Sequence, residues 1–507
     1  MRTTPASSTV RRLARQGHLI GDSWRPGAAD GVHRHRYAAT GAVQAEVGLG
    51  GATDIDDAVA AARRAQPAWA ALGPAGRSEL LGRLADLIDA HRGEVGELGA
   101  LDNGTPVSVL RPGRYTAAWV RFYADLVTTV TDEEIAVRRG AASVRLVPYG
   151  VVGVVPPWNG SMVGMGQKCG PALAAGNTVV VKPPELAPFG MLRFGELALE
   201  AGIPAGVVNI VVGGATAGTA LAGHPGVDKL TFTGGTVTAR AVMAAAAPNL
   251  TPLALELGGK SPNIVFDDAD LDTAALVAAM AGTAMLSGQG CALPTRTYVH
   301  EDVYDDLVAR VLTTLAGCAV GDPLDPATMV GPVVSESAME RILGVIDRAA
   351  ADGATLLTGG GRLGGEFAAG WFVAPTVFGD VDHDSDLARN EVFGPVQAIL
   401  RFSTEDEVLA KANDSPFGLA AYVHTADPDR LHRCVDRLAS GVVMTNGLGE
   451  LGPATPFGGF AQSGFGREGG RAGYEEMTQR TTVLAAAPLP PPPMPSPSRP
   501  TTDEGTT

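Results

Sequence analysis

Short apolar runs alternate with longer segments of helical periodicity through most of the chain. Segments such as Ser78–His91 repeat Leu and Ile at helical spacing, whereas the runs between the helical segments are short and rich in Val, as strands are. Strands are predicted at Val151–Val155, Thr178–Val181, Val207–Val212 and Leu230–Phe232, and helices at Asp54–Leu72, Met191–Ala201 and Thr216–Gly223. Strands that alternate with helices of this length form βαβ units, so the pattern predicts an α/β fold with a parallel sheet.

A second series of the same kind follows residue 260. Ser261–Phe266 and Arg296–His300 predict strands, and an Ala-rich helix is expected between them at Leu271–Leu286. The longest mostly apolar, uncharged stretch is Thr273–Gly290. A membrane-spanning helix needs about 20 strongly apolar residues, so we predict a buried helix here and no membrane association.

The segment Thr131–Val147 has a different pattern. Apolar Ile135, Val137, Val144 and Leu146 are interspersed with Arg residues, which predicts an exposed two-stranded ribbon. An exposed ribbon is normally covered, most simply by another subunit. We therefore expect a homodimer or a homotetramer.

Composition narrows the class of protein. The chain has 507 residues, of which 45% are apolar, so a disordered protein is excluded and two to four domains or subdomains are expected. The net charge is −15 and no basic patch is evident, which argues against nucleic acid as a partner. Four Cys exclude a disulfide scaffold, and without a CxxC pair or a nearby His cluster no metal site is predicted.

The two termini differ from the body in composition. Residues 1–16 carry four Arg and no acid, and residues 485–507 are rich in Pro. We expect both to be disordered tails, although the first faintly resembles an organelle transit peptide and the second could be a ligand for a Pro-recognition domain. With free thiols and no secretory signal, the expected location is the cytoplasm.

Three residues have side chains suited to covalent catalysis. Cys291 follows Gly288-Gln289-Gly290, where small neighbours leave its sulfur approachable by a substrate. Glu256 is flanked by apolar residues in the sequence, which should raise its pKa and suit it to act as a general base. Asn159, after a predicted strand, could donate its amide to an oxyanion. Taken singly, they are more simply a buried structural Cys, a turn carboxylate and a turn Asn.

Taken together with other segments, these residues resemble the NAD(P)-dependent aldehyde dehydrogenase superfamily over Leu19–Val483. The matching segments occur in family order; they include Val154–Gly160, Gly176–Glu185, Gly202–Asn209, Asp228–Gly234, Leu255–Pro262, Gly288–Cys291, Glu391–Val396, Pro416–Leu419, Pro456–Phe460 and Ser463–Glu468.

The resemblance implies a fold and a division of the chain. The fold is a Rossmann-like cofactor domain with an α/β catalytic domain and a small β-ribbon oligomerisation arm. The expected boundaries are 17–130 and 150–257 for the NAD-binding domain, 131–149 and 470–484 for the arm, and 258–469 for the catalytic domain.

The resemblance also implies the chemistry, which is oxidation of an aldehyde to the carboxylic acid. Cys291 would add to the aldehyde carbon, and Asn159 would hold the oxyanion. After hydride transfer to the nicotinamide, Glu256 would activate the water that hydrolyses the thioester. Lys182 is assigned to both the catalytic and the cofactor-binding residues.

The implied cofactor is NAD. Lys182 and Glu185 match positions at the adenosine ribose, where a carboxylate accepts from the 2′-hydroxyl and repels a 2′-phosphate; use of NADP is left open. The other expected cofactor-binding residues are Pro157, Trp158, Gly213, Phe232, Thr233, Gly234, Gly235, Leu257, Glu391 and Phe393.

The chain departs from the family pattern at several positions. A Ser of the cofactor loop is replaced by Gly235, a later Gly by Ala239, and an Asn before the nucleophile by Leu286. At the pocket positions Gly160, Gly164 and Gln167 the family often has bulkier side chains. These smaller side chains suggest a bulky aldehyde, unless other side chains refill the space.

Two alternatives use the same fold. One is a catalytically silent homologue with a binding or structural role, which would be expected to have lost Cys291, Glu256 or Asn159. The other is a CoA-acylating enzyme, which usually lacks the base. The presence of all three residues therefore favours a hydrolytic dehydrogenase.

Overall fold

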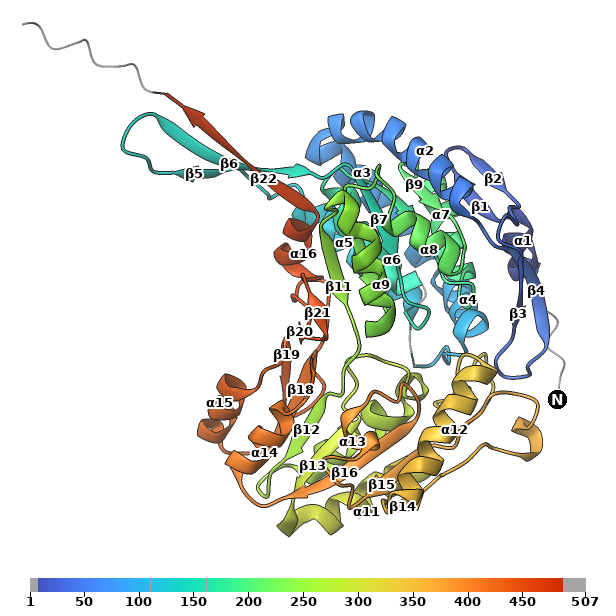
Figure 1. Ribbon diagram of the computed structural model, residues 1–507, viewed down its shortest axis with the longest axis vertical. Coiled ribbons are helices and arrows are strands. Elements are labelled where there is room, and N and C mark those ends of the chain that lie inside the picture. The colour runs from blue at the N-terminus through green and yellow to red at the C-terminus, as the bar shows by residue number, and fades with distance from the viewer. Residues whose placement is uncertain (1–7, 110, 161, 487–507) are drawn as a thin grey trace, which may run out of the picture.

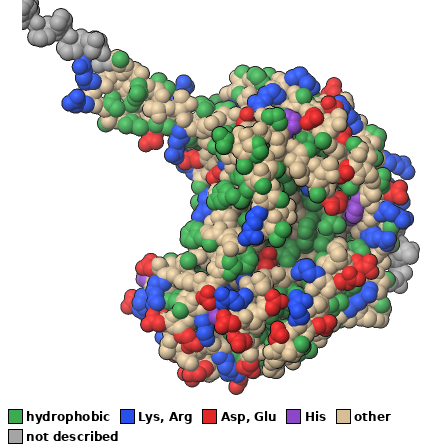
Figure 2. All heavy atoms as spheres, in the orientation of Figure 1, with side chains coloured by type: hydrophobic (Ala, Val, Ile, Leu, Met, Phe, Trp, Pro, Cys, Tyr) green, Lys and Arg blue, Asp and Glu red, His purple; other side chains and the backbone are tan. Residues whose placement is uncertain are grey.

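Two lobes and a projecting arm make up the molecule (Figure 1). The computed structural model describes residues 8–109, 111–160 and 162–486. Each lobe is built on one large sheet with helices on its faces. The two lobes face each other across a hollow whose visible walls are largely hydrophobic (Figure 2).

The first lobe contains an 8-stranded sheet. Its order is β2 (Ser23–Arg25), β1 (His18–Ile20), β9 (Val208–Ile210), β8 (Thr178–Val181), β7 (Val151–Val155), β10 (Lys229–Thr233), β11 (Leu253–Glu256) and β21 (Gly464–Phe465). The strands from β9 to β11 are parallel, and the pairings at both edges are antiparallel.

Both faces of the first sheet are buried, which explains its continuous Val runs. Val152 and Val154 lie in one apolar cluster, whereas Val151 and Val155 lie in another on the opposite face. The helices of this lobe are α1 (Ser8–Gln16), α2 (Ala52–Ala71), α3 (Gly73–Ala90), α4 (Arg92–Asn103), α5 (Pro112–Leu126), α6 (Met162–Ala174), α7 (Phe189–Glu200), α8 (Ala215–Ala222) and α9 (Thr236–Ala246).

The second lobe contains a 7-stranded sheet. Its order is β14 (Thr355–Thr358), β15 (Thr376–Gly379), β16 (Val396–Phe402), β13 (Arg296–His300), β12 (Pro262–Val265), β18 (Ala420–His424) and β19 (Val442–Thr445), with only the β14–β15 pairing antiparallel. Its helices are α10 (Leu271–Leu276), α11 (Tyr304–Ala316), α12 (Glu336–Ala351), α13 (Asp386–Arg389), α14 (Glu405–Asn413) and α15 (Pro428–Arg437).

Smaller elements connect these layers. They are the hairpin β3 (Val32–Arg36) and β4 (Val43–Gly48), the pair β17 (Phe417–Gly418) and β20 (Phe460–Ala461), helix α16 (Gly470–Glu476), and the 3₁₀ turns η1 (Ala247–Asn249), η4 (Glu301–Val303) and η5 (Gly365–Phe367).

The arm is a three-stranded antiparallel sheet that extends away from the lobes (Figure 1). Strands β5 (Glu133–Ile135) and β6 (Ala141–Pro148) form the expected ribbon, and β22 (Thr478–Ala485) adds a third strand along β6. The local pattern predicted two strands, and the resemblance assigned 470–484 to the arm; β22, largely within that segment, is the third strand.

Two predictions about the ends of the chain need correction. Residues 8–16, expected in a disordered tail, form α1, because Val10 and Leu13 are buried against the first lobe and offset the cost of ordering the helix. Ala485, expected in the Pro-rich tail, ends β22. Residues 1–7 and 487–507 lie outside the described residues.

The domain boundaries remain a prediction, but two segments near them lie in a different part of the structure from the one expected. The segment 464–465, expected in the catalytic domain, pairs with β11 of the first sheet. Residues 470–476, expected in the arm, form α16 at its base (Figure 1).

The Ala-rich segment after β12 is helical but not regular. It starts as α10, continues as a π-helix at η2 (Val277–Ala284) and ends as a 3₁₀ turn at η3 (Met285–Gly288). The stretch Leu271–Gly288 is long and apolar enough to cross a membrane by length and composition, and 61% of it is buried within the described structure. A buried core helix of a globular protein has the same properties.

Candidate active site

A cavity of about 700 Å³ lies at the carboxyl ends of the strands of the first sheet. Ligands of open parallel sheets bind at this edge because the strand-to-helix loops diverge there. Of the predicted cofactor residues, all but one line the cavity: Pro157, Trp158, Lys182, Glu185, Phe232, Thr233, Gly234, Gly235, Leu257, Glu391 and Phe393. Gly213 is not in the wall, although its carbonyl accepts a hydrogen bond from Lys182 Nζ at 3.0 Å.

The cavity fits a phosphate-bearing dinucleotide. Helix α9 begins after Gly235, and a side chain at Gly235 would project into open space, so the first amides of the helix are accessible from the cavity. Such amides and the helix dipole stabilise phosphate anions. Apolar side chains of α8 and α9, such as Ala222 and Val242, line the same cavity and could contact a flat aromatic base.

Cys291 lines the same cavity. It follows a turn in which Leu286, Ser287 and Gly288 all have positive φ, of 53°, 52° and 69°. The side chain of Ser287 fixes this turn by donating to the Gly331 carbonyl at 2.8 Å. The nucleophile is therefore presented by a tight left-handed turn and not by the end of a regular helix.

Asn159 also lines the cavity and is close to the nucleophile turn. Its Nδ2 donates to the carbonyl of Gln289 at 2.8 Å, two residues before Cys291. An amide nitrogen carries two hydrogens, so one remains for an oxyanion.

Glu256 ends β11, directly before Leu257 and Gly258, which line the cavity. Its Oε2 has no hydrogen-bond partner among the described residues. Gly259 lies directly against Cys291, since a side chain at Gly259 would come within 2.7 Å of the Cys291 carbonyl oxygen. The predicted nucleophile and oxyanion donor thus share the cavity, and the predicted base is close enough to Cys291 for its charge to act on the thiol.

Comparisons with known proteins agree with this arrangement. The family model described as "Aldehyde dehydrogenase family" matches residues 24–483. The chain belongs to this family. Its members are oxidoreductases that act on aldehydes, so the predicted family, fold class and enzyme class are confirmed.

Individual relatives match over nearly the whole chain. A betaine aldehyde dehydrogenase of Rhizobium leguminosarum bv. trifolii is 39% identical, over 94% of this chain and 98% of its own. The NAD⁺ complex of an aldehyde dehydrogenase from Bacillus cereus is 37% identical with a TM-score of 0.91, covering 95% and 99% of the two chains. An E. coli NADP-dependent enzyme is 34% identical with a TM-score of 0.90, covering 94% and 99%.

Burial dominates the electrostatics of this aldehyde dehydrogenase site. Burial, together with the charge of the neighbouring Glu468, raises the pKa of Glu256 to about 9, although Lys168 and Arg467 oppose the shift. Burial also raises the pKa of the Cys291 thiol to about 12, aided by the charges of Glu391 and Glu256. Without a bound cofactor, thiol and carboxyl are therefore both mainly protonated at neutral pH.

A buried ion pair lies near Glu256. Lys168 Nζ contacts Glu468 Oε1 at 2.5 Å and donates to Thr231 Oγ1 at 3.0 Å, and both charged side chains are almost fully buried. Glu468 could not be predicted as a neighbour of Glu256, because the two are far apart along the chain and meet only where the segment that begins with β21 pairs with β11.

Asn103 is a second residue that sequence reasoning missed. At the end of α4, its Nδ2 donates to the carbonyls of Trp158 and Asn159 at 3.0 and 3.3 Å, and its Oδ1 accepts from Thr105 N. It fixes the loop that carries the oxyanion donor. The motif Leu101-Asp102-Asn103-Gly104 was available as a signal, since Asn-Gly after a helical pattern marks a helix end with side-chain hydrogen bonds.

The wide pocket expected on the substrate side stays a prediction. A methyl group at Gly160 would contact Pro157 at 3.7 Å, and one at Gly164 would contact Pro156 and Pro157 at 3.5 Å, which are ordinary van der Waals distances. Val163 and Gln167 of α6 are partly exposed, whereas the other residues of this helix are buried. A small side chain would therefore fit at both glycines without displacing a neighbour.

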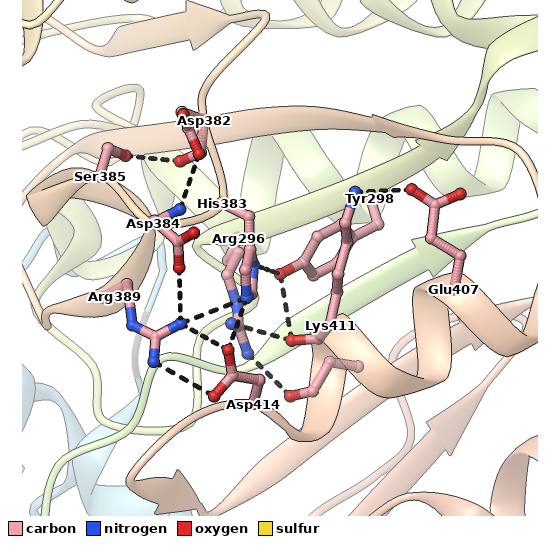
Figure 3. A network of polar contacts seen from close by, with 11 residues as sticks. Arg296, Tyr298, Asp382, His383, Asp384, Ser385, Arg389, Glu407, Lys411 and Asp414 are labelled. Atoms are coloured by element: carbon pink, nitrogen blue, oxygen red, sulfur yellow. Dashed lines mark hydrogen bonds and ion pairs between the residues drawn. The ribbon is translucent and has the colours of Figure 1, made fainter.

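One group of possible metal ligands occurs among the described residues, at the surface of the second lobe. Ligand atoms of His383, Asp384 and Asp414 lie within 4.8 Å of one another (Figure 3). Arg389 holds Asp414 with two hydrogen bonds of 2.7 and 3.2 Å, and Tyr298 bonds to His383 Nδ1 at 2.9 Å. The Arg389 guanidinium occupies the acceptors that a cation would need, so we interpret the group as a surface ion-pair network.

Proposed function

We propose that this aldehyde dehydrogenase oxidises a bulky aldehyde to the free carboxylic acid with NAD, through a covalent intermediate on Cys291. The observation that carries the proposal is that Cys291 and Asn159 share one cavity with Glu185 and the start of α9, and that Glu256 lies next to them.

The chain's own residues would act in a fixed order. A base takes the thiol proton, and Glu256 is suited to this role because it is close to Cys291 and its buried Oε2 has no hydrogen-bond partner among the described residues. The Cys291 sulfur then bonds to the aldehyde carbon, and the carbonyl becomes an oxyanion held by Asn159 Nδ2 and the Cys291 amide. NAD, when bound, supplies the hydride acceptor of this oxidation.

Hydrolysis completes the cycle. Deprotonated Glu256 takes a proton from water, the hydroxide oxygen bonds to the thioester carbon, and the carbon–sulfur bond breaks to release the acid and regenerate Cys291. A CoA-acylating enzyme would have no use for this base, so the presence of Glu256 supports release of a free acid.

Cofactor choice follows from Glu185 in the cavity wall. Its carboxylate suits a ribose 2′-hydroxyl and would repel the dianionic 2′-phosphate of NADP. We propose NAD as the preferred cofactor. The NAD⁺ complex of the Bacillus cereus relative supports this choice, and the NADP-dependent E. coli relative makes a direct test necessary.

The proposed substrate class rests on the missing side chains at Gly160 and Gly164. These glycines do not narrow the pocket and offer no aromatic face, and aromatic faces are what recognise quaternary ammonium groups such as that of betaine aldehyde. We therefore propose a bulky aldehyde without a quaternary ammonium group, in spite of the name of the Rhizobium relative.

The assembly and location are also proposals. The exposed apolar side chains of the arm, Ile135, Val137, Val483 and Leu484, support burial against a second copy in a dimer or tetramer. We further propose that the enzyme acts in the cytoplasm.

The decisive experiment measures NADH formation with a panel of short, bulky and quaternary-ammonium aldehydes, for the wild type and Cys291→Ala. We expect turnover to favour bulky aldehydes, to yield free acid and to vanish in Cys291→Ala while NAD still binds. Gly160→Phe should reverse the order of preference. Turnover that survives in Cys291→Ala, or an acyl-CoA product, would refute the mechanism.

A further inference from the structure

Helix α12 holds the turn that carries two of the cavity residues. Arg341 on this helix donates through Nη1 to the carbonyl of Val392 at 2.5 Å and through Nη2 to the carbonyl of Phe393 at 3.4 Å. Its guanidinium thus spans two successive peptide units between Glu391 and Gly394.

The held turn has an unfavourable backbone. Phe393 has φ of 50°, a left-handed conformation that a bulky residue adopts at a cost unless its surroundings impose it. Ile342, the next residue on α12, packs so closely on Gly394 that a side chain there would collide with it. Arg341 and Ile342 are therefore the contacts through which α12 imposes the turn.

The turn touches both halves of the active site. Glu391 and Phe393 line the cavity, and the Phe393 ring packs edge-on against Trp158 at 5.4 Å. On its other side, the Gly394 carbonyl lies so close to Gly288 that a side chain at Gly288 would overlap it. A shift of this turn would therefore move the cofactor contacts and the support of the nucleophile turn together.

The charge of Arg341 also bears on Glu391. Burial raises the pKa of Glu391 to about 7, and the Gly259 amide, Lys260 and Arg341 oppose the shift. Glu391 Oε1 accepts from Gly259 N at 3.1 Å, whereas the buried Lys260 Nζ has no hydrogen-bond partner among the described residues. Loss of the Arg341 charge should therefore raise the pKa of Glu391 further.

We propose that Arg341 is a positioning residue that sets the turn at Val392–Gly394, and through it both the cofactor-binding side chains of Glu391 and Phe393 and the turn before Cys291. This inference rests on the proposed use of NAD. A Lys at this position would keep the charge but would lose the planar guanidinium whose two nitrogens bond both carbonyls at once.

The test compares Arg341→Gln and Arg341→Lys with Arg348→Gln, a control on the same helix whose exposed side chain reaches Asp386 at 3.4 Å. Calorimetry of NAD binding between pH 6 and 9 is the first readout. We expect the dissociation constant to rise about tenfold in Arg341→Gln and several-fold in Arg341→Lys, and to stay unchanged in Arg348→Gln. The midpoint of the pH dependence should shift upward only in Arg341→Gln, because binding favours the ionised Glu391.

The second readout is the rate at which iodoacetamide modifies Cys291 without NAD, followed by peptide mass spectrometry. We expect a change of about threefold or more in both Arg341 variants, and none in Arg348→Gln. Unchanged NAD affinity and unchanged Cys291 reactivity in Arg341→Gln would overturn the inference. If Arg341→Gln does not fold, the same two measurements on Arg341→Lys decide it. Failure of the wild type to bind NAD would instead refute the proposed function.

Discussion

The two ends of the active-site cavity are built on different principles. The cofactor end is formed by regular elements, with Lys182 after β8, Thr233 at the end of β10 and Gly235 at the start of α9. The nucleophile end follows a π-helix and a turn of left-handed residues, supported by a second turn of the same lobe that lies about a hundred residues further along the chain. Regular strand ends need only their own sheet, whereas the nucleophile turn depends on contacts between loops that are distant in sequence.

The largest expected effect comes from the base that the first sheet provides. Glu256→Gln removes the only proton acceptor proposed for hydrolysis, so kcat should fall by about 10²- to 10³-fold. NAD binding should persist, and the acylated enzyme should accumulate, as intact-protein mass spectrometry would detect. Glu450→Gln, at an exposed residue, is the control. Full turnover by Glu256→Gln would mean that another residue is the base.

The next largest effect is expected at Asn159, the proposed donor to the oxyanion. Asn159→Ala should lower kcat/KM by about 10²-fold, because one donor to the oxyanion is lost. Asn103→Ala should cost about tenfold, since it only loosens the loop that carries Asn159. Steady-state kinetics with one aldehyde would rank the variants, and an equal or reversed ranking would contradict the assigned roles.

The pH dependence should distinguish the two buried carboxyl groups. Glu256, with its pKa raised to about 9, is an active base only when deprotonated, so hydrolysis should speed up from pH 7 to pH 9 by up to about 50-fold. Glu391, with its pKa raised to about 7, should strengthen NAD binding up to that pH and no further. Single-turnover hydrolysis and NAD titration over pH 6–10 would separate them. A flat hydrolysis profile would argue against Glu256.

The smallest effect concerns the backbone strain of the nucleophile turn. Leu250 and Leu286 have nearly the same positive φ, but Leu250 is 87% exposed and far less constrained by packing. Leu250→Asn should increase the free energy of unfolding by about 1 kcal/mol, since Asn tolerates this conformation.

Leu286→Asn should give a smaller gain, because the partly buried Leu side chain is lost, and it should change kcat less than about twofold. Urea unfolding of both variants would show the difference. A large destabilisation by Leu286→Asn would mean that side-chain packing, and not the turn, holds this region.

Much of the cofactor end could be predicted from the sequence. Strands β7 and β8 were predicted to the residue, because short Val-rich runs bounded by Gly and Pro leave little choice of element. The predicted cofactor residues lie together because strand ends of one parallel sheet share an edge. The irregular helix from Leu271 to Gly288 was predicted only as helical, since a π-helix and a left-handed turn leave no periodic signal.

The sequence by itself determined the α/β fold, the family and the identity of Cys291, Glu256 and Asn159 as candidates, because each depends on local pattern or on motifs in order. Only the tertiary structure decided their surroundings: Glu468 and Lys168 near Glu256, Gly259 against Cys291, and Arg341 on the turn of Phe393. These contacts join segments that are distant along the chain. The raised pKa values of Glu256 and Glu391 follow from the same packing, because desolvation depends on everything that surrounds a group and not on its neighbours in sequence.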